Sequence, residues 1–265
     1  MAVRVITAPP GYGKTLNMTR IAIELFNKHN EISLLNELKD KILKKDKIYK
    51  VNIYSNYPIL LKKSDRNMLW VDGAGNLKSG KEIYSNVIKF TDMCLSWNFC
   101  EEASFFIDEI AFTYDSMEYK DFPDAISHFF MIHRHLGYNM IYTNSQSISR
   151  IIKRVLCVSE EYWNVISMIT FLPIFNRVKF KITYDMKSSK DSENVVDDRQ
   201  EIVIKWFNKR KVYEAYDTKY LGELKKGLEM YDRGQWKSKR MSKEEILNNF
   251  IVSKEEKERL KDLEF

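Results

Sequence analysis

The chain has 265 residues, of which 44% are hydrophobic and 13% aromatic, enough to bury a sizeable core. Its formal net charge is +6, and residues 205–240 hold the whole excess, with eleven Lys or Arg against five Asp or Glu. The three cysteines, Cys94, Cys100 and Cys157, form no Cys-x-x-Cys pair and have no histidine at metal-ligand spacing, so neither a disulfide framework nor a zinc site is indicated.

This cysteine usage fits a reducing cytoplasm best. The N-terminus has no charged region followed by an apolar region, which argues against secretion. The longest apolar-rich stretch, residues 165–175, is too short to cross a bilayer, which takes about 20 residues, so no transmembrane helix is expected. The basic cluster at residues 205–240 fits an anionic partner, nucleic acid or a phospholipid surface, and equally a solvated face.

Hydrophobic periodicity predicts alternating strands and helices in the first part of the chain. Residues 104–107 are fully apolar after Ser104, as in a central strand of a parallel sheet. Beyond residue 175 the pattern changes, because two runs of alternating residues flank a polar linker at residues 187–199 and predict an antiparallel hairpin. The predicted strands are residues 3–7, 48–54, 68–71, 104–107, 138–142, 177–184 and 202–206, the turns are 55–58 and 72–76, and the helices are 13–28, 30–47, 122–136, 145–154 and 242–265.

Residues 8–15, Ala-Pro-Pro-Gly-Tyr-Gly-Lys-Thr, lie between the first predicted strand and helix. A P-loop (Walker A) needs backbone N–H groups turned toward phosphates, a lysine for the β and γ groups and a hydroxyl on Mg²⁺. A helix N-cap beside a solvated lysine is the alternative. Ala8 replaces the glycine of the full pattern, but the left-handed positions are expected at Gly11 and Gly13, so the loop can still close. We therefore predict an ATP site made of Ala8, Pro9, Pro10, Gly11, Tyr12, Gly13, Lys14, Thr15 and Leu16.

The apolar run at residues 104–107 ends in Asp108 and Glu109. Hydrolysis of a nucleotide requires a carboxylate that holds the Mg²⁺ shell and a second group that orients or deprotonates the attacking water. Following a P-loop by about 90 residues, this pair has the place of a Walker B motif. We predict that Thr15 and Asp108 hold Mg²⁺ and that Glu109 activates water.

The strand at residues 138–142 ends in a cluster of amides and hydroxyls. In a P-loop sheet this end lies beside the γ-phosphate, so Gln146 or Asn144 could sense that phosphate, and an ordinary strand-to-helix turn is the alternative. His133 and His135 lie two residues apart, too far round a helix to share a ligand, and we expect them to be packing or capping residues.

These motifs together resemble the zonular occludens toxin-like family, the assembly ATPases of filamentous phages. The resemblance covers about residues 1–220. It rests on the N-terminal P-loop, residues 54–58 (Tyr-Ser-Asn-Tyr-Pro), the run ending in Asp108 and Glu109, and His-Arg-His-x-Gly at residues 133–137 followed by Gln146. The Tyr-rich residues 211–217 also look like that family.

The resemblance implies a RecA-like P-loop fold related to the pumping ATPases of the FtsK and HerA group. It implies a mostly parallel sheet flanked by helices in an ATPase domain, residues 1–220, which includes a β-hairpin at 176–207 and is followed by a basic helical extension, residues 221–265. The implied activity is ATP-driven translocation of phage DNA, single-stranded by expectation, by a homo-oligomeric ring during virion assembly and extrusion through the host inner membrane.

Members of this family usually carry a membrane-spanning helix after the ATPase domain, and this sequence shows none. The expected location is therefore the host cytoplasm at the inner membrane, held there by a membrane-embedded assembly partner or by the basic stretch. The alternatives are a genome-packaging ATPase that is not anchored in the membrane and a non-motor P-loop switch or kinase.

Two further sets of residues are candidates for contact with partners. A ring ATPase needs a cation from the neighbouring subunit, for which Arg150 and Arg134 are preferred over Arg154. Of the aromatic residues that lie beside basic ones, Trp236 is the candidate for stacking on DNA bases, whereas Trp206 is expected in the core.

Overall fold

The computed structural model describes residues 2–33, 47–95, 99–100, 102–113, 124–171, 175–184 and 200–216. These residues belong to one compact unit, Met1–Asp217, and the second unit, Thr218–Phe265, lies outside them. The helix predicted at residues 242–265 and Trp236 are therefore outside the described residues. The same holds for most of the helix predicted at 30–47, whose described start is a turn.

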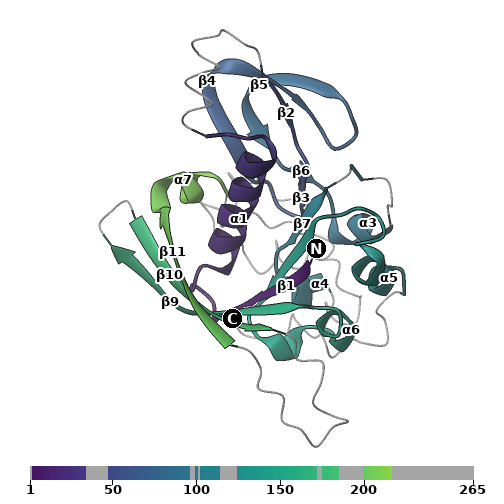
Figure 1. Cartoon of the computed structure of the whole chain (residues 1–265), viewed down its shortest axis with the longest axis vertical. Helices are drawn as coiled ribbons and strands as arrows, with labels where there is room; N and C mark the ends of the chain where they lie inside the picture. Colours follow the sequence, from purple (N-terminus) through teal and green to yellow (C-terminus); the bar gives the residue numbers. More distant parts are fainter. Residues whose placement is uncertain are drawn as a thin grey trace, which may run out of the picture. The chain divides into compact units, whose positions relative to one another are not determined.

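Eight strands form the central sheet, and their bounds are β1 (Ala2–Thr7), β3 (Ile53–Ser55), β6 (Asn86–Val87), β7 (Ser104–Ile107), β8 (Met140–Ser145), β9 (Glu161–Phe171), β10 (Phe175–Tyr184) and β11 (Gln200–Asn208). Their order is β11-β10-β9-β1-β8-β7-β3-β6 (Figure 1). From β9 to β6 every neighbouring pair is parallel, and β10 is antiparallel to both β9 and β11. The predicted α/β fold, a RecA-like mostly parallel sheet with a β-hairpin, is confirmed.

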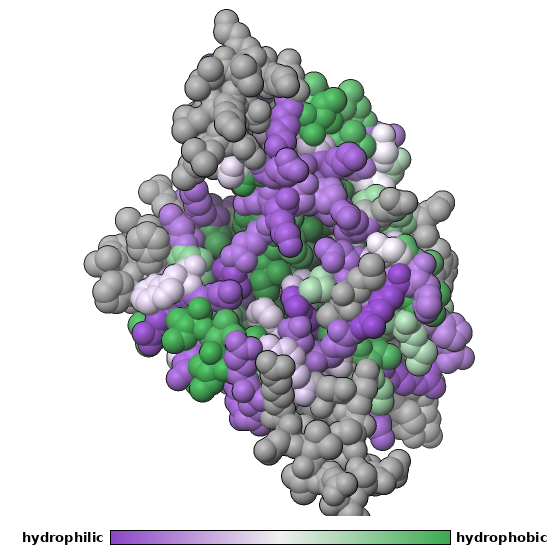
Figure 2. Space-filling view, in the orientation of Figure 1, coloured by the Kyte–Doolittle hydropathy of each residue, from purple (hydrophilic) through white to green (hydrophobic). Residues whose placement is uncertain are grey.

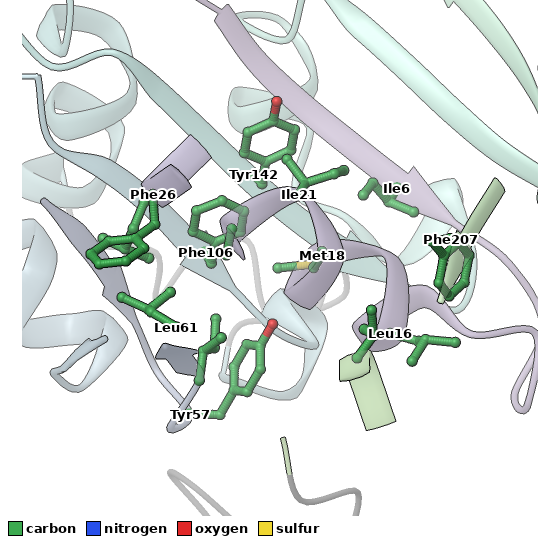
Figure 3. Packing of buried hydrophobic residues seen from close by; sticks show 14 of the residues in the cluster. Ile6, Leu16, Met18, Ile21, Phe26, Tyr57, Leu61, Phe106, Tyr142 and Phe207 are labelled. Carbon is green, nitrogen blue, oxygen red and sulfur yellow. The ribbon is translucent and has the colours of Figure 1, made fainter. Parts of the chain in front are cut away.

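Helices cover both faces of the parallel part of this sheet, which explains why β1, β7 and β8 are apolar on both sides. One face packs on α1 (Lys14–His29) and α7 (Lys209–Glu214), through Met18, Ile21 and Val212. The other packs on α3 (Phe90–Leu95), α5 (Asp124–Ile132) and α6 (Lys153–Leu156). The strand sequences divide by alternation, so that Phe106 faces α1, as Figure 3 shows, whereas Phe105 faces α5.

A second sheet of three strands, in the order β2-β4-β5, consists of β2 (Ile48–Lys50), β4 (Leu60–Val71) and β5 (Leu77–Tyr84). The single strand predicted at residues 48–54 is wrong, because the chain crosses here from one sheet to the other. The Val51 N–H still donates to Val71 of β4, at 3.0 Å, whereas the Asn52 carbonyl already accepts from Ser104 of β7, at 2.9 Å. The strand predicted at 68–71 is the end of β4, whose charged middle faces solvent and hides the pattern.

The region after β7 also differs from prediction. After α4 (Ile110–Thr113) and α5, a turn in which Gly137 has φ +73° leads to β8, which begins and ends later than the predicted residues 138–142. The helix predicted at 145–154 is instead a 3₁₀ turn, η2 (Ile148–Arg150), followed by the short α6. Ser145 still pairs with Thr7 of β1, and the extended Ile151 and Ile152 separate η2 from α6, so no continuous helix forms here.

Two further features correct or complete the sequence prediction. Trp206, expected in the core, lies on the edge strand β11 with 54% of its surface exposed. Strands β5, β6 and β9 were not predicted. Within the described part of the chain, no helix has the length and hydropathy needed to cross a membrane.

Replacing the ring at the centre of the aromatic cluster should destabilise the fold. Phe105 is fully buried. The centre of its ring lies 5.0, 5.1 and 5.1 Å from the ring centres of Phe99, Phe129 and Tyr138, which is the range of edge-to-face aromatic contacts. We expect Phe105→Ala to lower the free energy of unfolding by about 3–5 kcal/mol, measured by chemical denaturation. Leu77→Ala, at a position 62% exposed, is the control and should cost less than about 0.5 kcal/mol. Equal losses would contradict this core assignment.

Candidate functional site

The loop between β1 and α1 has the backbone of an anion-binding loop. Gly11 and Gly13 both have left-handed φ angles, +81° and +75°, as predicted. Ala8 is buried and is not among the described non-glycine residues with positive φ, so alanine fits in place of the glycine of the full pattern. The loop ends at the N-terminus of α1, where N–H groups and the helix dipole favour anions.

Strand β9 supports the second glycine of this loop. A Cβ atom on Gly13 would lie 2.8 Å from the sulfur of Met168 and 3.6 Å from Leu16. The left-handed backbone is the main reason that this residue is glycine, because the end of the flexible Met168 side chain could shift to make room for a methyl group.

Lys14 and Thr15 point at the acidic end of β7. The Lys14 Nζ lies 3.4 Å from the Glu109 Oε1, and the lysine side chain is only 7% exposed. The Thr15 hydroxyl donates to the Asp108 Oδ1 at 2.8 Å. The four residues predicted to bind phosphate and Mg²⁺ and to activate water therefore converge at the carboxyl edge of the sheet.

Two asparagines hold the backbone at Asp108 and Glu109. Asn56, just beyond β3, accepts from the Asp108 N–H at 2.8 Å and donates to the Asp108 carbonyl at 3.0 Å. Asn144, near the end of β8, accepts from the Glu109 N–H at 2.9 Å and donates to the Asp108 carboxylate. These bonds matter because Glu109 has φ +48°, a strained angle for a residue with a side chain.

Burial raises the pKa of the Asp108 carboxyl group, and the Glu109 charge adds to this, whereas hydrogen bonds from Asn144 and Thr15 and the charge of Lys14 lower it. A carboxylate that has lost its water in this way is favoured in its ionised form by a bound cation. The Thr15 hydroxyl and the Asp108 carboxylate are oxygen donors of the kind that Mg²⁺ prefers.

No group of three or more His, Cys, Asp or Glu side chains within the described residues is arranged to hold a metal ion by itself. Mg²⁺ commonly takes only one or two protein oxygens and completes its shell with water and substrate phosphates. The Thr15 and Asp108 pair fits that mode of binding.

Three other predicted site residues, Gln146, Arg134 and Arg150, are exposed. Gln146 is exposed just beyond β8, where the buried Asn144 makes the contacts with the acidic pair. Arg134 is exposed and paired with Glu160, near the start of β9 and away from the carboxyl edge. Arg150 is exposed at the end of η2.

The two histidines and Arg154 play no part in the cluster. His133 is buried with its Nδ1 2.8 Å from the Phe130 carbonyl oxygen, so it is a packing residue as expected. Burial lowers its pKa. Arg154 forms an exposed ion pair with Asp124 at 2.8 Å.

Sequence reasoning missed the role of Asn56. It placed this residue in a turn, although the Tyr-Ser-Asn-Tyr-Pro stretch was a visible signal. In the structure the neighbouring Tyr57 is also buried, and its hydroxyl lies 3.3 Å from the Thr19 hydroxyl of α1. This stretch therefore connects β3, α1 and the acidic end of β7.

The fold and this site define a RecA-like P-loop NTPase. No protein-family model and no curated protein matches the chain. Among solved structures, the chain is similar to the N-terminal domain of zonular occludens toxin from Neisseria meningitidis, with 16% identity, 82% of this chain and 98% of that chain covered, and a TM-score of 0.41.

A second similar structure is the genome packaging NTPase of Sulfolobus turreted icosahedral virus 2 in complex with ATP-gammaS. The identity is 12%, the alignment covers 65% of this chain and 77% of that chain, and the TM-score is 0.39. Because both TM-scores are below 0.5, the assignment rests on the sheet order and the loop geometry. The first of these structures comes from the family that the sequence motifs resemble.

Adding a methyl group to the second loop glycine should weaken nucleotide binding selectively. Gly13→Ala forces alanine into a left-handed angle, at about 1–2 kcal/mol, and turns the loop N–H groups away from the phosphates. We expect at least about a tenfold loss of ATP affinity, measured by calorimetry. Gly75→Ala is the matched control, since Gly75 has φ +84° in a turn outside the site. Gly75→Ala should lower the free energy of unfolding by a similar amount and leave ATP affinity unchanged. Equal losses of ATP affinity in the two variants would refute the loop assignment.

Removing the Asn56 side chain should impair turnover through the position of Asp108. Asn56→Ala is expected to cost about 1–3 kcal/mol of stability and to lower nucleotide turnover about 10- to 100-fold. Asn52→Ala removes a comparable hydrogen bond from a buried asparagine, donated to the Glu102 carbonyl at 3.1 Å, away from the site. The control variant should match the stability loss and keep turnover, which steady-state kinetics and denaturation together would show.

Proposed function

We propose that the protein is an ATP-hydrolysing motor that translocates phage DNA, single-stranded by expectation, during assembly and extrusion of filamentous virions. The observation that carries the catalytic part is the convergence of Lys14 and Thr15 on Asp108 and Glu109 across the sheet edge. The motor part rests on the resemblance of the P-loop, acidic and His-Arg-His-x-Gly motifs to the filamentous phage assembly ATPases.

In this proposal each residue of the cluster has one task. The loop N–H groups and Lys14 bind the β and γ phosphates, while Thr15 and Asp108 hold Mg²⁺, which would supply charge neutralisation at the phosphates. A bound γ-phosphate competes with Glu109 for Lys14, and the released carboxylate then orients or deprotonates the attacking water. Asn144 contacts both Asp108 and Glu109, so it is better placed than Gln146 to report the state of the phosphate.

The proposed assembly is a homo-oligomeric ring in which an arginine from the neighbouring subunit stabilises the transferring phosphoryl group. Arg150 follows β8 shortly after its carboxyl end, on the side of the site, whereas Arg134 precedes β8. Arg150 is therefore the first candidate and Arg134 the second. The proposed location is the cytoplasmic face of the host inner membrane, with a membrane-embedded phage partner.

Turnover by purified protein tests both parts of the proposal. Lys14→Ala should abolish ATP binding and turnover, whereas Glu109→Gln should keep binding and lower turnover by a factor of about 10²–10⁴. Lys63→Ala and Glu82→Gln are matched controls, because they break an exposed ion pair of 2.6 Å in the β4–β5 hairpin.

DNA separates the motor from other P-loop proteins. Single-stranded DNA is expected to stimulate the wild-type turnover. Turnover that is the same with single-stranded DNA, with duplex DNA and with neither would favour a nucleotide-dependent switch or kinase and count against the motor. Stimulation by duplex DNA alone would favour a packaging ATPase.

A further inference from the structure

Strands β9, β10 and β11 extend the central sheet beyond the helices and expose one face. Their inner face packs on the core through Val178, Phe180 and Phe207. The side chains between these point the opposite way, and we call that side the outer face. By strand register it holds three rows across the strands, Asn164–Lys181–Ile202, Ser167–Lys179–Ile204 and Ile169–Arg177–Trp206.

The outer face combines a line of cations with a line of apolar groups. Arg177, Lys179 and Lys181 follow each other along β10 at every second residue, which spaces them about 6.8 Å apart. Each lies beside an apolar residue of β11, and Ile202, Ile204 and Trp206 are 59%, 47% and 54% exposed. The described residues of these rows include no carboxylate. Figure 2 shows apolar side chains gathered over this part of the sheet among hydrophilic ones.

The indole ring of Trp206 is an exposed flat aromatic surface on the outer face. The guanidinium carbon of Arg177 lies 5.8 Å from the centre of its ring, so a cation and an aromatic plane are held together at one end of the cation line. The sequence predicted a buried position for Trp206. Because its ring is exposed instead, a partner can contact it. A partner that carries both flat apolar groups and regularly spaced negative charges would satisfy both lines.

The outer face is connected to the nucleotide loop through β9. Met168 and Ile169 are consecutive and therefore point to opposite faces of the strand. Ile169 stands in the row with Arg177 and Trp206, whereas the Met168 sulfur is 2.8 Å from the position of a Cβ on Gly13. A partner that shifts β9 from outside would therefore move a contact of the P-loop.

We propose that the outer face of β9–β11 binds single-stranded nucleic acid and conveys that binding to the P-loop through β9. The inference rests on the proposed motor function, for which it names the surface. Phosphates match the cation line, and unpaired bases match Trp206 and the isoleucines. A duplex hides its bases and would leave the exposed apolar side chains unused. The lack of carboxylates in the described rows disfavours a second copy of this positively charged chain.

The test compares two variants by fluorescence anisotropy with a labelled oligothymidylate at several salt concentrations. Trp206→Ala should weaken binding roughly 5- to 100-fold through loss of stacking. A triple variant, Arg177→Gln, Lys179→Gln and Lys181→Gln, should reduce the slope of log affinity against log salt by about 2, at about 0.7 per phosphate contact. The matched controls are Leu77→Ala and the triple variant Lys63→Gln, Lys78→Gln and Lys81→Gln, on the second sheet.

Both outer-face variants should keep their unfolding midpoint and the turnover measured without DNA, and lose most of the stimulation by single-stranded DNA. Unchanged oligothymidylate affinity in both would overturn the inference. So would variants that lose only binding to phosphatidylglycerol vesicles, or only self-association in sedimentation. If the wild-type protein hydrolysed no ATP but bound oligothymidylate through this face, the proposed function would fail while the binding surface stood.

Discussion

The hydrogen bonds that Asn56 and Asn144 form with the backbone of Asp108 and Glu109 are the constraint on which the site depends. A positive φ at Glu109 persists only where its surroundings over-determine it. The sheet order explains how they do so, because β7 lies between β8 and β3, which place one asparagine on each side of the corner. The order of strands, rather than any local motif, thus sets the direction of the two carboxylates.

The cluster around Asp108 and Glu109 also brings together charged groups whose burial costs free energy. Lys14 is almost completely buried, and Asp108 has lost enough water for its pKa to be raised. Such groups are tolerated where each has a partner, and here Thr15, Asn144 and Glu109 provide them. Their arrangement also means that the groups which would bind a phosphate already hold one another in place, so ligand binding exchanges partners instead of creating a site from loose side chains.

The sequence predicted those parts of the site that depend on residues adjacent in the chain. The left-handed glycines, Lys14, Thr15 and the acidic end of β7 all follow from short motifs. The Tyr-Ser-Asn-Tyr-Pro stretch marked this region, but the sequence did not show that Asn56 contacts Asp108, because that contact depends on β3 pairing with β7, some fifty residues away in sequence. Alternation identified which residues of β11 share a face but not that the face of Trp206 lies beyond the covering helices, and the charged middle of β4 masked a long strand.

The position of β8 between β1 and β7 has a consequence for how the chain can vary in length. Met140 is aligned with both Ala2 and Ser104, and side chains change faces at every residue. An insertion of one residue between Met140 and Asn144 would place Thr143 beside Asp108 and Glu109, and a deletion would place Ser145 there. Neither side chain has an amide that could form the hydrogen bonds of Asn144. Evolution or engineering can therefore lengthen the loop after Ser145, but this strand admits no insertion.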